Sequence, residues 1–326
     1  MTESVASTST TELMLRVEAV RRAAEGVVVV EFVDPDGDEL PEWTPGSHLE
    51  IVLPSGLVRH YSLCGDPANR RSYSVAVLRV GDGRGGSIEI HDSGIVGRTL
   101  VVRCPRNRFP LEDAPDYLFL AGGIGVTPLL PMARQLVQTG KSYMMVYGAR
   151  SSGSFAFADD LRGLAGDRIR FVDESVDGRP DFATALDAAR PGTAVYCCGP
   201  EGMIRAIEQL VAERAGTVNL HVERFVPSGT VEVSREGDQD FEIFLERTGR
   251  SVFVPADRTA LEMVREILPS HPYSCLEGEC GSCEVAVLEG EVDHRDEVLT
   301  DEEKAENTAM MLCVSRARSS KLVIDL

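Results

Sequence analysis

The chain has 326 residues, enough for two or three domains of ordinary size. Its 52 acidic residues outnumber its 33 basic residues, and the net charge of −19 argues against nucleic acid or an anionic membrane surface as a partner. No apolar run approaches the ~18 residues of a membrane span, and the N-terminus lacks the basic and apolar segments of a signal peptide. We therefore expect a cytoplasmic protein that does not bind membranes and keeps its cysteines reduced.

Residues 1–12 are polar and rich in Ser and Thr, and we expect them to be disordered. Short β-type runs separated by turn signals follow up to about residue 111, and no long helical period appears among them. This pattern predicts an antiparallel barrel or sandwich over residues 13–112. The expected strands are Gly26–Val33, His48–Leu53, Tyr73–Val80 and Gly97–Arg103.

Two short motifs lie in this first domain, RHYSLC from Arg59 and GRGGS ending at Ser87. Each alone is weak evidence, because such residues are common in ordinary strands and turns. Together they indicate a site for a ring and a phosphate. Gly85 and Gly86 allow close approach of backbone N–H groups to an anion, and Arg59 supplies a positive charge.

Residues 113–227 have a different pattern. The run YLFLA, Tyr117–Ala121, is continuously apolar, as expected for a parallel strand buried on both faces. A glycine turn and an apolar helical face follow, and Thr127 is the expected helix N-cap, with Pro128 in the first helical position. Strand-like and helical stretches then alternate, which predicts an α/β domain. The other expected strands are Ser142–Gly148, Arg168–Asp173 and Ala194–Cys198.

Two glycine turns follow strands of this second domain, AGGIG and the Cys198-Gly199-Pro200 turn. Ligands of open α/β sheets collect at the carboxyl ends of the strands, and a helix N-terminus beside a glycine turn binds pyrophosphate well. The turns therefore predict a dinucleotide site, although ordinary strand-to-helix turns would show the same residues.

A linker is expected at residues 228–238, and the β pattern restarts in a third domain, residues 239–326. A helix is expected at Thr259–Leu268, with Leu261 and Val264 on its apolar face. This domain has 19 acidic and 9 basic residues, a net charge of −10. The acidic surface is either simply solvated or a docking surface for a basic partner.

The most specific pattern in the chain is C-x4-C-x2-C followed by a distant cysteine. This is the plant-type ligand spacing for a [2Fe–2S] cluster. A structural zinc site is the alternative, but zinc sites usually pair C-x2-C with a second closely spaced pair. The predicted cluster ligands are Cys275, Cys280, Cys283 and Cys313.

The motifs RHYSLC, GRGGS, RNRFPL, AGGIGVTPLLPMAR, YGAR, YCCGPEGM, HVERF and the cysteine pattern occur in one order. This order resembles the phthalate dioxygenase reductase family, which includes vanillate demethylase reductases. The resemblance covers nearly everything after Leu13. It implies an antiparallel FMN-binding β-barrel, a Rossmann-like α/β NAD-binding domain and a C-terminal β-grasp ferredoxin domain. It also implies a monomeric NADH-dependent oxidoreductase whose electron acceptor is a terminal oxygenase, of the Rieske type or a cytochrome P450.

The resemblance also implies roles for single residues. Phe225 is expected to lie against the flavin ring, with Cys198 and Thr127 at the nicotinamide. Asp173 is expected to accept a hydrogen bond from the ribose 2′-OH of NADH. Cys104 departs from the family, which more usually has a small residue such as Gly there, and this leaves the cofactors unchanged. The expected FMN residues are Arg59, His60, Tyr61, Ser62, Val77, Gly85, Gly86 and Ser87. The expected NADH residues are Gly122, Gly123, Gly125, Arg150, Asp173, Gly199 and Pro200.

Two other functions remain open from the sequence, a stand-alone NADH diaphorase and a non-catalytic adaptor with a structural zinc. The combination of parts favours the reductase. NADH gives up two electrons as a hydride, a [2Fe–2S] cluster takes one at a time, and a flavin does both. A covalently attached acidic ferredoxin domain is hard to reconcile with a diaphorase.

Overall fold

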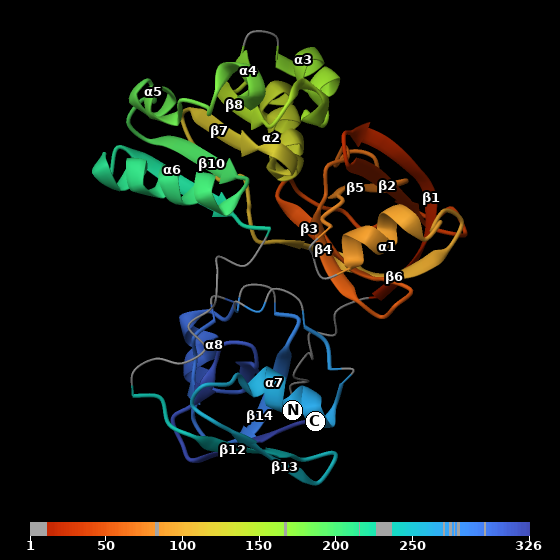
Figure 1. The fold of residues 1–326 in the computed structure, drawn as a ribbon, viewed down its shortest axis with the longest axis vertical. Coiled ribbons are helices and arrows are strands. Elements are labelled where there is room, and N and C mark those ends of the chain that lie inside the picture. Colours follow the sequence, from red (N-terminus) through yellow and green to blue (C-terminus); the bar gives the residue numbers. More distant parts are fainter. Residues whose placement is uncertain are drawn as a thin grey trace, which may run out of the picture. The chain divides into compact units, whose positions relative to one another are not determined.

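The computed structural model describes residues 12–81, 85–165, 168–214, 216–225, 237–269, 271–273, 276, 278, 281–296 and 298–326. The chain forms two compact units, Met1–Phe225 and Val226–Leu326 (Figure 1). The first unit contains an antiparallel sheet followed by a parallel α/β sheet, and the described residues of the second form a mixed sheet, a two-stranded sheet and two helices.

The first six strands form one antiparallel sheet in the order β4-β3-β6-β1-β2-β5. A bridge between Leu63 and Val75 joins its two edges at one end, so the sheet curls into the barrel that the sequence predicts. Alternate side chains such as Leu49 and Ile51 fill the interior. The strands are β1 (Glu12–Ala24), β2 (Val27–Val33), β3 (Ser47–Val52), β4 (Val58–Ser62), β5 (Tyr73–Leu78) and β6 (Thr99–Asn107).

Two features of the barrel differ from the sequence prediction. Strand β1 begins at Glu12, which pairs with Arg103, so Glu12 does not belong to the segment expected to be disordered. Residues 1–11 of that segment lie outside the described residues. A helix, α1 (Gly86–Asp92), begins within the GRGGS motif, where no helix was predicted. Its seven residues are too few to produce a recognisable helical period.

The α/β sheet is parallel, with strand order β11-β10-β7-β8-β9, as predicted for a Rossmann-like domain. Alternate residues of β7 point to opposite faces. Phe119 packs with α2 and α3, whereas Leu120 packs with α5 and α6. The two pairs of helices cover the two faces of the sheet (Figure 1). The strands are β7 (Tyr117–Gly122), β8 (Tyr143–Ala149), β9 (Ile169–Asp173), β10 (Thr193–Cys198) and β11 (Val218–Glu223). The helices are α2 (Val126–Gln138), α3 (Ala158–Ala165), α4 (Glu174–Asp177), α5 (Phe182–Asp187) and α6 (Glu201–Glu213), with 3-10 turns at Gly123–Gly125 and Ser152–Ser154.

The predicted N-cap role of Thr127 is wrong. Helix α2 begins at Val126, its N-cap position is Gly125, and no side chain caps it. Thr127 lies inside the first turn, where its hydroxyl donates to the carbonyl of Ile124 at 3.0 Å. Pro128 is tolerated there because N–H groups of the first turn have no partner within the helix.

The second unit is built on a mixed sheet with strand order β13-β12-β18-β14-β16, in which β12 and β18 run parallel. Helix α7 packs on it through Leu261 and Val264 and begins with a capping box between Thr259 and Glu262. This is the predicted β-grasp arrangement. Its elements are β12 (Phe241–Leu245), β13 (Arg250–Val254), α7 (Ala260–Ile267), β14 (Glu284–Glu289), β15 (Val292–Asp293), α8 (Asp301–Glu306), β16 (Ala309–Met311), β17 (Arg316–Ala317) and β18 (Lys321–Ile324).

Candidate redox centre

The barrel and the α/β sheet share one apolar core. Arg134, on α2, donates to the carbonyl oxygens of Cys64 at 3.1 Å and Gly65 at 2.8 Å, which follow β4. The same buried cluster contains barrel residues such as Val27 and Cys64 together with side chains of α2. The predicted flavin and nicotinamide residues therefore lie in one compact unit.

The predicted phosphate turn lies against Arg59. Gly85 has a left-handed backbone (φ 81°) and immediately precedes α1. A Cβ atom on Gly86 would lie 2.5 Å from Nε of Arg59, so the arginine side chain crosses the turn directly against this glycine. The hydroxyl of Ser87 accepts from the backbone N–H of Val80 at 3.1 Å, which anchors α1 to the chain after β5. The turn and its arginine thus form a preorganised cationic corner.

The other predicted flavin residues are held by the barrel. Nε2 of His60 lies 3.3 Å from a carboxylate oxygen of Glu50, and its ring stacks on His48. Val77 is fully buried in the barrel core, so only its backbone can contact a ligand. Tyr61 packs partly against that core, and burial raises its pKa to about 12. Tyr61 is therefore a neutral hydroxyl at physiological pH.

Ser62 donates from its hydroxyl to the carboxyl group of Glu223, at 3.0 Å. The two residues are the last of β4 and β11, so this bond joins the barrel to the parallel sheet. Desolvation by burial raises the pKa of Glu223 to about 8. At neutral pH the pair is therefore a hydroxyl against a protonated carboxyl, and it places a transferable proton at the predicted ring end of the site.

Glu223 lies within the HVERF motif, but no role was predicted for it from the sequence. A usable signal existed, because a glutamate at the end of a buried parallel strand needs a partner. The identity of that partner, Ser62, could not be inferred. The two residues are 161 positions apart and meet only after both sheets have formed.

The two glycine turns pack against each other. A Cβ atom on Gly199 would lie 3.0 Å from Cα of Gly122, and one on Gly125 would lie 2.2 Å from the carbonyl oxygen of Cys198. Gly125 and Gly199 are therefore needed where backbone meets backbone, whereas a Cβ on Gly122 would meet the side chains of Met203 at 2.6 Å and Pro200 at 2.7 Å. Gly123 differs, since it has φ +53° and open space where a Cβ would stand. Among the predicted turn glycines, Gly123 has the free surface that an approaching phosphate would need.

The three predicted catalytic residues differ in exposure. Cys198 and Thr127 are buried, with exposures of 0% and 1%, whereas Phe225 is 40% exposed. Burial raises the pKa of the Cys198 thiol well above its ordinary value, so this group is a neutral thiol rather than a nucleophile. Phe225 alone of the three presents a broad surface to a planar ligand.

The predicted ribose residue Asp173 ends β9, and Arg150 is an exposed residue just after β8. Asp173 is the N-cap of α4, and its Oδ1 accepts from the backbone N–H of Ser175 at 3.0 Å and from the Ser175 hydroxyl at 2.6 Å. These hydrogen bonds lower the pKa of Asp173, which keeps it anionic at neutral pH. Its charge faces solvent at the carboxyl edge of the sheet.

Two of the four predicted cluster ligands lie within the described residues. Cys283 and Cys313 are both 2% exposed, and a hydrogen bond of 3.3 Å from the N–H of Leu312 to the carbonyl of Cys283 brings their segments together. Gly278 has φ +74°, and a Cβ there would lie 2.5 Å from Val314, so Gly278 packs beside the residue that follows Cys313. Cys275 and Cys280 lie outside the described residues.

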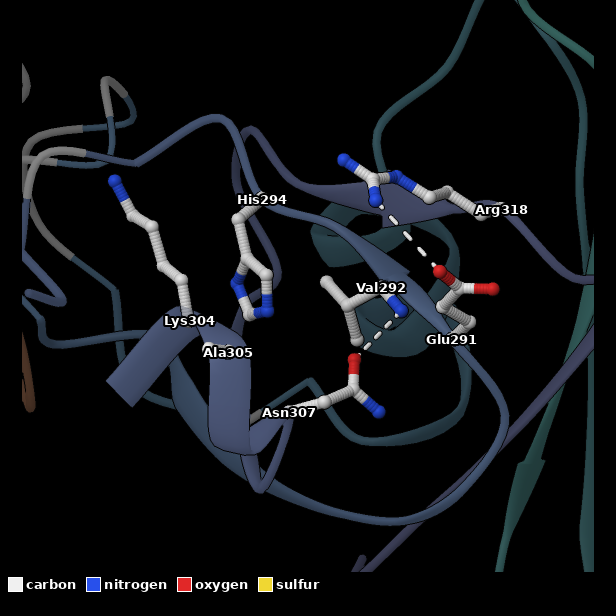
Figure 2. A pocket seen from close by; sticks show the side chains of 7 residues that line it. All are labelled: Glu291, Val292, His294, Lys304, Ala305, Asn307 and Arg318. Carbon is white, nitrogen blue, oxygen red and sulfur yellow. Dashed lines mark hydrogen bonds and ion pairs between the residues drawn. The ribbon is translucent and has the colours of Figure 1, made fainter. Parts of the chain in front are cut away.

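Figure 2 shows a surface pocket of about 350 Å³ in the second unit. His294 lines it, and in the described part of the chain neither ring nitrogen has a hydrogen-bond partner. Nδ1 of His294 lies 3.7 Å from a carboxylate oxygen of Asp296. Lys304 and Arg318 also line the pocket, and Arg318 lies 3.6 Å from Glu291. None of the residues predicted to hold a cofactor lines this pocket.

Two family models match the chain. Residues 119–209 match the oxidoreductase NAD-binding domain, and residues 243–318 match the 2Fe-2S iron-sulfur cluster binding domain. The phthalate dioxygenase reductase of Burkholderia cepacia is 38% identical over 320 residues, which cover 96% of this chain and 97% of the relative. The chain belongs to the phthalate dioxygenase reductase family.

The fold comparisons agree with this membership. A solved phthalate dioxygenase reductase structure matches with a TM-score of 0.69 and 37% identity, covering 97% of this chain and 98% of that one. An intact type IV self-sufficient cytochrome P450 monooxygenase matches with a TM-score of 0.81 and 40% identity. This chain covers 41% of that longer protein and is itself covered to 97%.

The cofactors of this family are FMN, NADH and a [2Fe–2S] cluster, and the described residues fit them. The cradle at Gly86, which a Cβ would fill, suits a phosphate beside Arg59, and the exposed ring of Phe225 suits stacking. Cys283 and Cys313 are buried on segments that a backbone hydrogen bond joins, as expected of two ligands of one cluster. Among the described residues, no helix is long and apolar enough to cross a membrane.

Proposed function

We propose that the chain is the reductase component of an oxygenase system. It passes electrons from NADH through FMN and a [2Fe–2S] cluster to a separate terminal oxygenase, of the Rieske type or a cytochrome P450. The observation that carries this proposal is that one chain combines a barrel with the predicted flavin motifs, an NAD-binding domain and a 2Fe-2S domain. Strand β4, which carries the predicted flavin motif, and the two glycine turns predicted to bind NADH lie in one unit. A 2Fe-2S domain follows on the same chain.

The division of labour follows the predicted domains. Residues 13–112 hold FMN, residues 113–227 hold NADH, and residues 239–326 hold the cluster, after a linker at 228–238. The linker falls largely on residues outside the described part of the chain. We further propose that the protein is a cytoplasmic monomer.

When bound, FMN accepts a hydride from NADH and releases electrons singly. The guanidinium of Arg59 and the backbone of Gly85 and Gly86 would hold the flavin phosphate. Ser62 and Glu223 hold a proton beside the ring end of the site, at a distance of 3.0 Å from each other. The exposed ring of Phe225 would stack against the flavin and control the access of the nicotinamide. The buried thiol of Cys198 and the hydroxyl of Thr127 shape the wall behind the nicotinamide turn and keep water out.

On the nucleotide side, the free surface at Gly123 receives the pyrophosphate. Asp173, kept anionic by Ser175, accepts a hydrogen bond from the ribose 2′-OH and repels a 2′-phosphate. Arg150 lies exposed after the neighbouring strand β8 and suits the outer, anionic part of the nucleotide. These contacts select NADH over NADPH through both a hydrogen bond and charge repulsion.

The exit for electrons is the C-terminal domain, whose net charge of −10 suits a basic docking face on the oxygenase. Reconstitution tests the whole proposal. The purified protein is mixed with oxygenases encoded near it, and NADH oxidation is followed with and without the substrate of each oxygenase. We expect substrate-dependent NADH oxidation with one partner. Oxidation that no oxygenase alters would support the diaphorase, and a colourless, zinc-containing protein would support the adaptor.

A further inference from the structure

The predicted flavin residues give the site a direction along β4. The ring end is marked by Ser62, which contacts Glu223, and the phosphate end by Arg59, which contacts the turn at Gly86. Ser62 is three positions after Arg59 along the strand, a span of about 10 Å. A longer ligand would therefore continue past Arg59, toward the start of β4 and the turn that precedes it.

That preceding turn is tied to α1. It is closed by hydrogen bonds of 2.8 Å, one of which runs from the backbone N–H of Leu53 to the carbonyl of Leu57. At its tip, Ser55 donates to Glu89 of α1 twice, from its backbone N–H to Oε1 at 2.9 Å and from its hydroxyl to Oε2 at 2.5 Å. The side chain of Leu57 lies 3.8 Å from where a Cβ of Gly85 would stand, so the turn reaches the phosphate corner itself.

We propose that this Ser55–Glu89 clasp restricts the site to the mononucleotide flavin. FMN ends at one phosphate, whereas FAD continues into a second phosphate and an adenosine. The clasp joins the turn before β4 to α1, and this connection lies where the second phosphate and the adenosine of FAD would extend. It also puts a carboxylate one helical turn beyond the phosphate corner, where a second phosphate would meet its negative charge. The inference rests on the proposed function, because it takes FMN to be bound at Arg59.

The matched control lies on the same helix. Asp92, in the last turn of α1, pairs with Arg79 at 2.7 Å rather than with the turn at Ser55. Asp92→Asn therefore removes a carboxylate from α1 without opening the clasp. Glu89→Ala removes both the charge and the clasp, and Glu89→Gln removes the charge while keeping an acceptor oxygen for Ser55.

The experiment equilibrates each flavin-loaded protein with equal excesses of FMN and FAD, then releases and quantifies the bound flavins by chromatography. We expect wild type and Asp92→Asn to hold FMN. Glu89→Ala should raise the bound FAD to FMN ratio by about tenfold, a change of ~1.4 kcal/mol in relative affinity. Glu89→Gln should raise it by less.

An unchanged ratio in Glu89→Ala, or an equal rise in Asp92→Asn, would overturn the inference. Where Glu89→Ala does not fold, an unchanged ratio in Glu89→Gln overturns it instead. A wild-type protein that takes FAD as readily as FMN would also refute the clasp but leave the reductase function standing. A wild-type protein that binds no flavin would refute the function itself.

Discussion

Replacing Glu223 with Gln tests whether the carboxyl beside Ser62 carries a proton at neutral pH. Burial raises the pKa of Glu223 from 4.5 to about 8, which corresponds to about 5 kcal/mol at ~1.4 kcal/mol per pKa unit. Because the folded pKa lies above the unfolded one, the folded chain keeps a proton that the unfolded chain loses. Stability from this group is therefore complete below about pH 4.5, falls as the pH rises toward 8, and stays lower above that.

The assay is urea unfolding of the flavin-loaded full chain at several pH values from 5 to 9, followed by flavin fluorescence. The free energy of unfolding of the wild type should fall relative to that of Glu223→Gln by ~3–5 kcal/mol across this range. Glu213→Gln, which removes an exposed carboxylate at the end of α6, is the control for loss of one charge from the same unit. Parallel pH profiles for wild type and Glu223→Gln would refute a buried, protonated carboxyl.

The remaining predictions address the choice between NADH and NADPH, the role of Phe225 at the flavin ring, and the C-terminal domain as the exit for electrons. Asp173→Ala should narrow the kcat/KM preference for NADH over NADPH by ~1–3 kcal/mol, while Asp181→Ala, which removes the similar N-cap of α5, should leave the preference unchanged. Phe225→Ala should keep FMN but change the rate of flavin reduction by NADH in stopped flow, by about 0.5–1.5 kcal/mol of stacking; flavin loss alone would make Phe225 a packing residue. Removal of residues 228–326 should preserve NADH-dependent dye reduction and abolish rapid cytochrome c reduction, and Cys313→Ser should do the same while retaining flavin. A truncated protein as fast as the full chain would exclude the C-terminal domain as the exit.

The fold was largely predictable because its signals are local. The apolar run Tyr117–Ala121 became the central strand of a parallel sheet, and the cysteine spacing alone was enough to identify the C-terminal domain. The failures were at element starts. Thr127 looked like an N-cap, which would start the helix at Pro128. The 3-10 turn at Gly123–Gly125 instead leads directly into α2, so the helix starts earlier, at Val126. A turn of that kind has no period that a sequence pattern can reveal.

The predicted site residues are at the expected strand ends, but the sequence could not separate their physical roles. Gly122, Gly125 and Gly199 appeared equivalent to Gly123, yet a Cβ on any of the first three would meet neighbouring atoms, and among these four glycines only Gly123 has open space. A glycine that allows close packing and a glycine that exposes N–H groups to a ligand cannot be distinguished in the sequence. The distinction depends on what stands opposite each Cα, which is a tertiary property.

The contacts that the sequence missed altogether share one physical origin. Glu223 and Glu89 are acidic residues whose partners, Ser62 and Ser55, lie on strands or turns far from them in the chain. A contact between one carboxyl and one hydroxyl produces no repeating pattern in the sequence, because it involves a single residue from each of two distant segments. The Ser62–Glu223 pair lies at the end of β4, where the buried carboxyl needs a partner to avoid a desolvation penalty. The Ser55–Glu89 pair lies instead at an exposed turn before β4. The residues predicted to bind FMN were thus found from motifs, whereas Glu223 and Glu89, for which we propose roles at the flavin site, could be found only from the folded structure.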